Sequence, residues 1–132
     1  MWMYCGDGIG WLNAQVQRDT GLWYSAEYST FSISDDAAGY RMTVAGYSGD
    51  AGDALRAHSK PEYNSNGKRF STRDRDNDGS TNNCAANKSN GWWYDRCSRS
   101  ILTQNSVAVW TTVSAGPGPR DVQASRMLVK IN

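Results

Sequence analysis

Residues 74–84, with the sequence DRDNDGSTNNC, carry the most specific pattern in this chain of 132 residues. Asp74, Asp76 and Asp78 alternate, and Gly79 follows where a sharp turn brings main-chain carbonyl groups toward the same point. Hard cations such as Ca²⁺ need several oxygen ligands at short range, and carboxylates this close otherwise repel one another. The stretch therefore predicts a calcium-binding loop, with a solvated Asp/Asn turn as the simpler alternative.

This loop differs from an EF-hand in two ways. Its twelfth position is Ala85, where an EF-hand needs a bidentate Glu, and no amphipathic helices are predicted on either side of it. The acidic pattern therefore indicates calcium binding by a different kind of loop.

The chain has three cysteines, which cannot all pair within it. Cys84 ends the acidic loop, and a bond from it to Cys97 closes a tight loop around residues 91–94, GWWY. A metal site on these cysteines is the weaker interpretation, because the chain has no C-x-x-C pair and His58 is far away in the sequence. We therefore predict a Cys84–Cys97 disulfide, typical of a secreted protein, with Cys5 unpaired or bonded to a cysteine elsewhere.

Length and charge exclude several classes of protein. The chain is long enough for one domain, and its 14 Lys and Arg against 13 Asp and Glu give a net charge of +1 with no basic cluster. This balance argues against a protein that binds nucleic acid or a membrane surface. No apolar run approaches the roughly 20 residues that cross a bilayer, and no targeting segment is expected at the N-terminus.

Alternation of apolar and polar residues predicts short strands joined by many loops. The predicted strands cover residues 12–16, 22–24, 28–33, 40–45, 107–110 and 127–131, with a turn at residues 18–21. Residues 50–57 predict a short helix with Asp50 as its N-cap. The polar residues 59–90 predict little regular structure, so the 6 Trp and 7 Tyr are expected to hold the loops together.

Several motifs in order closely resemble the fibrinogen C-terminal-like domain, a family that includes fibrinogen chains, ficolins, tachylectins, tenascins and angiopoietins. The segments that carry the resemblance are residues 28–31 (YSTF), 40–44 (YRMTV), 46–55 (GYSGDAGDAL), 70–78 (FSTRDRDND), 83–85 (NCA) and 91–94 (GWWY) with Cys97. This resemblance implies an extracellular α+β domain with a twisted antiparallel sheet, short helices and a loop-rich subdomain for calcium and ligand.

The resemblance also predicts how the chain is organised. It is dense from about Trp23 to Cys97 and thinner toward Asn132. The family's N-terminal subdomain has no counterpart before Leu12, so residues 12–132 are expected to form a partial domain and residues 1–11 a separate N-terminal segment. Oligomers are expected to form through regions outside this sequence, and the sequence does not determine the oligomeric state.

Carried over to this chain, the family's calcium site consists of the side chains of Asp76 and Asp78 and the main-chain oxygens of Ser80 and Asn82, completed by water. Asp74 is then a nearby supporting carboxylate and not a calcium ligand.

In lectins of this family, an acetyl group binds beside the second loop cysteine, between main-chain N–H groups and aromatic walls, and a cis peptide precedes that cysteine. The corresponding ligand-binding residues here are Arg96, Cys97 and Ser98, with Trp93 or Trp110 as a wall. Many relatives have His after this cysteine and then Asn-Leu-Asn-Gly, whereas this chain has Ser98 followed by RSILTQ.

The leading interpretation is a secreted, calcium-dependent, lectin-like module that binds acetylated or other surface glycans in innate recognition. The alternative is a protein–protein interaction domain of matrix or growth-factor type, because the fold also serves receptors that bind no sugar. No enzyme is expected, because the chain has no G-x-S-x-G or H-E-x-x-H motif and His58 is interpreted as structural. Asn87-Lys88-Ser89 is an N-glycosylation sequon, and an unmodified surface turn is an alternative of at least equal weight.

Overall fold

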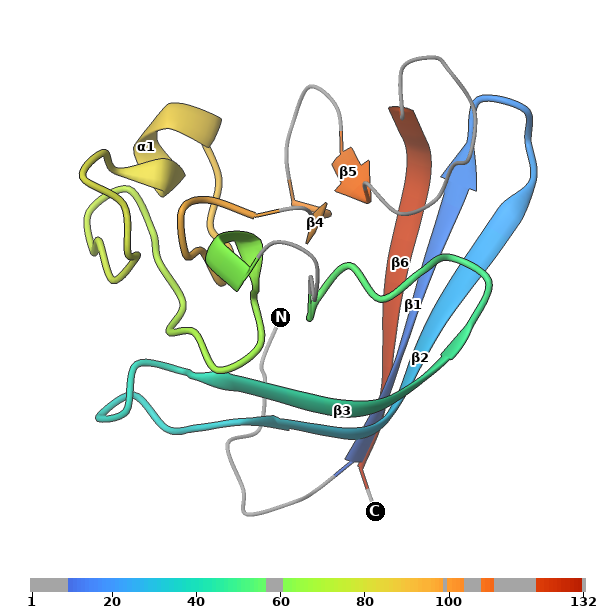
Figure 1. The fold of residues 1–132 in the computed structure, drawn as a ribbon, viewed down its shortest axis with the longest axis horizontal. Helices are drawn as coiled ribbons and strands as arrows, with labels where there is room; N and C mark the ends of the chain where they lie inside the picture. The colour runs from blue at the N-terminus through green and yellow to red at the C-terminus, as the bar shows by residue number, and fades with distance from the viewer. Residues whose placement is uncertain (1–9, 57–60, 99, 104–107, 111–120, 132) are drawn as a thin grey trace.

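Figure 1 shows the computed structural model, which describes residues 10–56, 61–98, 100–103, 108–110 and 121–131. Within these ranges, six strands form one antiparallel sheet in the order β3-β2-β1-β6-β5-β4. The strands are β1 (Gly10–Arg18), β2 (Trp23–Ile33), β3 (Met42–Gly49), β4 (Ser100–Ile101), β5 (Ala108–Trp110) and β6 (Asp121–Ile131). The short helices are η1 (Pro61–Tyr63) and α1 (Cys84–Lys88). The predicted α+β class, an antiparallel sheet with short helices, is confirmed.

The β1–β2 hairpin forms where the alternation predicts it. Leu12, Ala14 and Val16 of β1 are buried, and the registers place Leu12 opposite Tyr28 of β2 on one side and opposite Val129 of β6 on the other. At the turn, the N–H of Gly21 donates to the carbonyl of Arg18 at 2.9 Å. These strands therefore bury one face of the sheet through residues two apart.

Strands β2 and β3 form the edge of the sheet beside β1, and β3 extends through the glycines that were expected to end it. Gly46 adopts a φ of +70°, and a Cβ at this position would collide with the side chain of Ser29 on β2. On β2, the buried positions are even-numbered before Ser29, as at Tyr28, and odd-numbered after it, at Phe31. Glycine therefore permits a close strand contact where the buried side of the hairpin changes.

The helix predicted over residues 50–57 does not form in the described part of that segment, residues 50–56, which is a bend followed by a turn. Asp50 does not cap a helix, because its Oδ1 accepts the main-chain N–H of Ser25 at 2.8 Å. Asp53 accepts the hydroxyl of Tyr28 at 2.8 Å, and Gly52 has a φ of +86°. Hydrogen bonds to β2 therefore override the local helix pattern.

A loop-rich part with α1 lies beside the sheet (Figure 1). Aromatic side chains join the two parts, because the buried ring of Trp93 packs against Phe70 at 5.0 Å and Trp92 at 5.2 Å. The indole N–H of Trp93 also donates to the carbonyl of Tyr40, just before β3, at 2.8 Å. The aromatic residues thus connect loops that have little regular structure, as the composition predicts.

Some sequence predictions concern residues outside the described ranges. Cys5, His58 and Val107 lie there, so the partner of Cys5 and the role of His58 stay predictions. Among the residues that the structure describes, no helix has the length and apolar character needed to cross a membrane.

Tyr28 provides a test of the contact between β2 and the turn after β3. Its side chain is fully buried, and burial together with the Asp53 carboxylate raises the pKa of its hydroxyl, which stays a protonated donor. We expect Tyr28→Phe to lower the free energy of unfolding by about 1.5–3 kcal/mol, because the carboxylate loses its donor. Urea unfolding measures this change.

Tyr24→Phe is the matched control, because the Tyr24 hydroxyl makes no hydrogen bond in the described part of the chain and its loss should change stability by less than about 0.5 kcal/mol. Equal unfolding midpoints for the two variants would show that the Tyr28–Asp53 bond contributes nothing.

Candidate functional site

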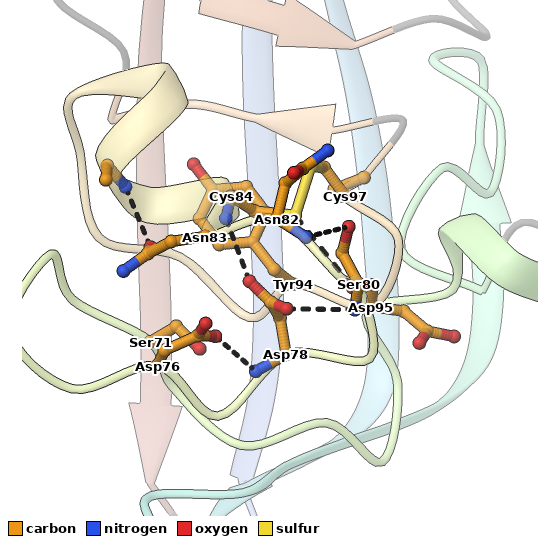
Figure 2. Close-up of a disulfide and its surroundings, with 12 residues drawn as sticks. Ser71, Asp76, Asp78, Ser80, Asn82, Asn83, Cys84, Tyr94, Asp95 and Cys97 are labelled. Atoms are coloured by element: carbon orange, nitrogen blue, oxygen red, sulfur yellow. Dashed lines mark hydrogen bonds between the residues drawn. A yellow bond between two sulfur atoms is a disulfide. The ribbon is translucent and has the colours of Figure 1, made fainter.

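The predicted disulfide is present and links the acidic loop to the segment after the GWWY motif (Figure 2). Cys84 and Cys97 are bonded, with a Cα–Cα distance of 5.6 Å. Cys84 is also the first residue of α1, whose N-cap is Asn83, with its Oδ1 accepting the N–H of Ala86 at 2.9 Å. The disulfide therefore fixes the start of this helix beside residues 95–98.

Asp78 connects the two ends of the acidic loop. Its Oδ1 accepts the main-chain N–H of Ser80 at 2.9 Å, and its Oδ2 accepts that of Cys84 at 2.9 Å (Figure 2). Asp76 lies next to it, with its Oδ1 accepting the N–H of Asp78 at 3.1 Å. The carboxylates are therefore held by the backbone of the loop that carries them.

The carboxyl group of Asp76 influences the ionisation of Asp78. Partial burial raises the pKa of Asp78, and the neighbouring carboxyl of Asp76 raises it further, although the N–H groups of Cys84 and Ser80 lower it. A cation bound between the two carboxyl groups would instead lower the pKa of Asp78, because it stabilises the ionised carboxylate. The pair therefore has the electrostatic character of a cation site.

Asp74 stands apart from this pair. It is exposed, and its Oδ1 accepts the hydroxyl of Thr72 at 2.8 Å, a bond that lowers the pKa of Asp74. Asp74 therefore has its own partner within the turn that precedes the loop.

Three contacts that the sequence did not predict hold the acidic loop in place. Asn77 donates its main-chain N–H to Ser71 Oγ and its side-chain amide to the carbonyl of Phe70, both at 2.9 Å. Gly79 donates its N–H to the carbonyl of Asp95 at 3.0 Å. A Cβ on Gly79 would collide with Asp95 Oδ1, so the glycine permits the present position of this carboxylate, which a larger residue would displace.

The available oxygen atoms suit a hard cation. In the described part of the chain, the main-chain carbonyls of Ser80 and Asn82 accept no hydrogen bond, so both can act as ligands beside Asp76 and Asp78. The same residues contain no group of three or more His, Cys, Asp or Glu side chains that could hold a metal. A cation here would therefore depend on two carboxylates, main-chain carbonyls and water, a donor set that fits calcium.

The segment predicted to bind ligand lies beside the disulfide. Arg96 is exposed, whereas Cys97 and Ser98 are half-buried, and among the described residues the N–H groups of Cys97 and Ser98 donate no hydrogen bond. The expected cis peptide before Cys97 is absent, since none occurs in the described ranges. The trans form is instead held by main-chain bonds from Asp95 to Cys97 and from Arg96 to Glu62.

The two tryptophans predicted as a ligand wall lie in the core, which corrects that prediction. Trp110 is fully buried, and its indole N–H donates to the carbonyl of Gly52 at 3.1 Å. Trp93 has only 5% of its surface exposed and packs between Phe70 and Trp92. Burial of these large rings favours packing over presentation to solvent.

Ser98 has a structural contact that the sequence did not indicate. Its hydroxyl lies 2.9 Å from that of Ser65, and it donates to the carbonyl of Ser100 at 2.9 Å. Ser65 and Ser100 are fully buried, so Ser98 joins two distant segments through its side chain. A change at Ser98 therefore affects packing as well as the main-chain N–H.

Comparison with known proteins identifies the family. The family model described as "Fibrinogen beta and gamma chains, C-terminal globular domain" matches residues 8–114. The chain belongs to this family. The match includes the acidic loop and both cysteines of the disulfide, so the fibrinogen-related fold and these two features occur together.

Individual relatives agree with this assignment. Fibrinogen C domain-containing protein 1 of Macaca fascicularis is 50% identical over 89 residues, which cover 64% of this chain and 19% of that protein. Tenascin of Gallus gallus is 43% identical over 82 residues, which cover 62% of this chain and 4% of tenascin. The fibrinogen-like globe domain of human ANGPTL6 has a TM-score of 0.79 and 29% identity, covering 94% of this chain and 57% of that chain. The chain thus spans only part of these fibrinogen-related proteins.

The disulfide should stabilise this fibrinogen-related chain strongly. We expect Cys84→Ser with Cys97→Ser to lower the free energy of unfolding by about 3 kcal/mol, because the bond restricts a short loop in the unfolded chain. Chemical unfolding of the oxidised protein and the double variant measures this difference.

Peptide mapping of oxidised protein serves as the control and should recover the two cysteines in one linked peptide pair. Recovery of both as free thiols would contradict the assignment.

Proposed function

We propose that this fibrinogen-related chain is an extracellular recognition module that binds Ca²⁺ through Asp76, Asp78 and the main-chain oxygens of Ser80 and Asn82. The observation that carries the proposal is the pair of adjacent carboxyl groups, in which burial and Asp76 together raise the pKa of Asp78. The main-chain carbonyls of Ser80 and Asn82, which accept no hydrogen bond from the described residues, lie in the same loop. The disulfide supports an extracellular location, because such bonds persist in oxidising compartments.

Calcium would act as a brace for the surface beside the disulfide. Asp78 binds the N–H of Cys84, and Cys84 is bonded to Cys97, so an ion that fixes Asp78 also restrains the backbone near Ser98. An ordered backbone loses less conformational entropy when a ligand binds. The ion thus supports recognition without touching the ligand.

The ligand surface of this module consists of Arg96 and the main-chain N–H groups of Cys97 and Ser98. The N–H groups are suited to a carbonyl or acetyl oxygen, because they donate no hydrogen bond in the described part of the chain. The exposed guanidinium of Arg96 adds donors beside them. This chemistry supports lectin-like binding of acetylated or other surface glycans, with a role in innate recognition.

A second function, binding of a protein partner without sugar, is favoured by one observation. Trp93 and Trp110 are buried, so neither supplies an exposed aromatic wall for an acetyl group. The similarity to tenascin, a matrix protein, supports a module of matrix type, because one fold can serve partners of different chemical classes. Both functions use the same calcium loop and differ in the chemistry of the ligand.

Calcium binding is tested by its effect on stability. Calcium should raise the melting temperature of the wild-type chain, because an ion that binds only the folded state stabilises it by about 2.7 kcal/mol at 100 times its Kd. Asp76→Ala and Asp78→Ala should each abolish this shift. Differential scanning fluorimetry with calcium and with chelator measures it.

Asp74→Ala is the matched control, since Asp74 bonds to Thr72 and lies outside the proposed ligand set. It should keep the calcium-dependent shift. A shift that survives in the Asp76 and Asp78 variants would exclude the proposed ligands.

A glycan array separates the two functions. Wild-type chain in calcium should bind acetylated glycans, and both chelator and Asp78→Ala should reduce this signal, because the donors near Cys97 lose their brace. Asp74→Ala should bind as the wild type does. Absence of any glycan signal, together with saturable binding to an immobilised extracellular matrix protein, would support the protein-binding function instead.

A further inference from the structure

The side chain of Asn87 is exposed and has no structural role. Asn87 lies in α1, where its main-chain N–H donates to the carbonyl of Asn83 at 3.0 Å. Its side-chain amide makes no hydrogen bond within the described residues. Lys88 and Ser89, which follow it, are exposed as well. Chemical modification of this amide therefore costs the fold no contact.

Neighbouring asparagines differ from Asn87 in this respect. The side chain of Asn83 caps α1 and also donates to the carbonyl of Arg73 at 3.0 Å. The amide of Asn90 donates to Thr103 Oγ1 at 3.1 Å, and its Oδ1 accepts the hydroxyl of Tyr94. Of these three asparagines, only Asn87 presents a free amide to solvent.

Asn87 also lies in the one N-glycosylation sequon of the sequence. Asn87-Lys88-Ser89 has the required Asn-x-Ser pattern with no proline, and no other asparagine of the chain is followed two residues later by Ser or Thr. Ser89 ends α1 in a left-handed conformation with a φ of 59°, so the sequon lies at the end of the helix, where the chain turns. The sequon and the exposed asparagine side chain thus coincide at Asn87.

A pocket of about 420 Å³ adjoins this position. It is lined by Thr72, Arg73, Asp74, Ser89, Asn90 and Gly91. Two of these residues directly follow the sequon's Lys88, and the bond from Asn83 to Arg73 holds α1 against the opposite wall. A large group on Asn87, two residues before Ser89 in the pocket wall, would therefore lie close enough to reach the pocket.

We infer that Asn87 carries an N-linked glycan and that this glycan shields the pocket between residues 72–74 and 89–91. The inference rests on the extracellular location in the proposed function, because the modification takes place in the secretory pathway.

The group transfer requires a lipid-linked oligosaccharide pyrophosphate as donor. A C–N bond forms between Asn87 Nδ2 and the anomeric carbon of the first sugar, and the bond from that carbon to the pyrophosphate breaks. The lipid pyrophosphate is the leaving group, and Nδ2 loses one proton. No change of oxidation state is involved.

Secretion of the chain from a eukaryotic cell tests the attachment site. The chain, directed to the secretory pathway by an added signal peptide, should show a mobility shift that peptide N-glycosidase removes, leaving Asp at position 87. Asn87→Gln and Ser89→Ala should each abolish the shift. Lys88→Ala is the matched control and should keep it, because it changes an exposed residue inside the sequon without removing the Asn-x-Ser pattern.

Trypsin cleavage after Arg73 tests the shielding. Arg73 is exposed at the pocket wall, so the native glycoprotein should be cut there several-fold more slowly than the same protein after enzymatic deglycosylation or the Asn87→Gln variant. Cleavage after the exposed Arg41, which does not line this pocket, is the control and should not change. Equal rates after Arg73 in all three proteins would overturn the shielding.

The glycosylation test and the calcium-binding test can succeed or fail separately. Secreted protein that shows the calcium-dependent melting shift but has unmodified Asn87 would overturn this inference and leave the proposed function intact. Glycosylated protein without a calcium response would support the inference and contradict the calcium site. A chain retained inside the cell and unmodified would contradict both the extracellular location and this inference.

Discussion

The bond between Cys84 and Cys97 is the constraint on which the loop-rich part of the molecule depends. Cys84 is at once the end of the acidic loop, the first residue of α1 and a main-chain donor to Asp78. Residues 64–83 contain no helix or strand of their own, so their order relies on side-chain hydrogen bonds, on isolated main-chain hydrogen bonds such as that from Gly79 to Asp95, and on this covalent link. A domain of this size gains much from such a bond because its core is modest.

Polar atoms of buried aromatic residues attach this part to the sheet. Trp93 donates to Tyr40, Trp110 donates to Gly52 and Tyr28 donates to Asp53, so each large ring packs in the core while its N–H or O–H reaches a loop. A buried donor without a partner is costly, and these pairings therefore specify where each loop lies. The same bonds remove Trp93 and Trp110 from the ligand surface.

Local pattern predicted the strands well and the helices poorly. Alternation at Leu12, Ala14 and Val16 succeeds because one face of β1 is buried. The helix predicted after Asp50 is wrong, since Asp50 binds the backbone of Ser25 instead of capping. Helix α1 was missed because its stability comes from the Asn83 cap and the disulfide at Cys84, while its five residues carry no amphipathic pattern.

The sequence by itself determined the family, the disulfide pair and the spacing of the acidic residues in the proposed calcium loop, because each depends on residue type and position along the chain. Only the tertiary structure decided which of these groups are accessible. It buried Trp110, joined Ser98 to Ser65, and left the carbonyls of Ser80 and Asn82 without a hydrogen bond from the described residues. Exposure and pairing depend on contacts between segments far apart in the chain, such as Gly79 with Asp95, and no local pattern encodes them.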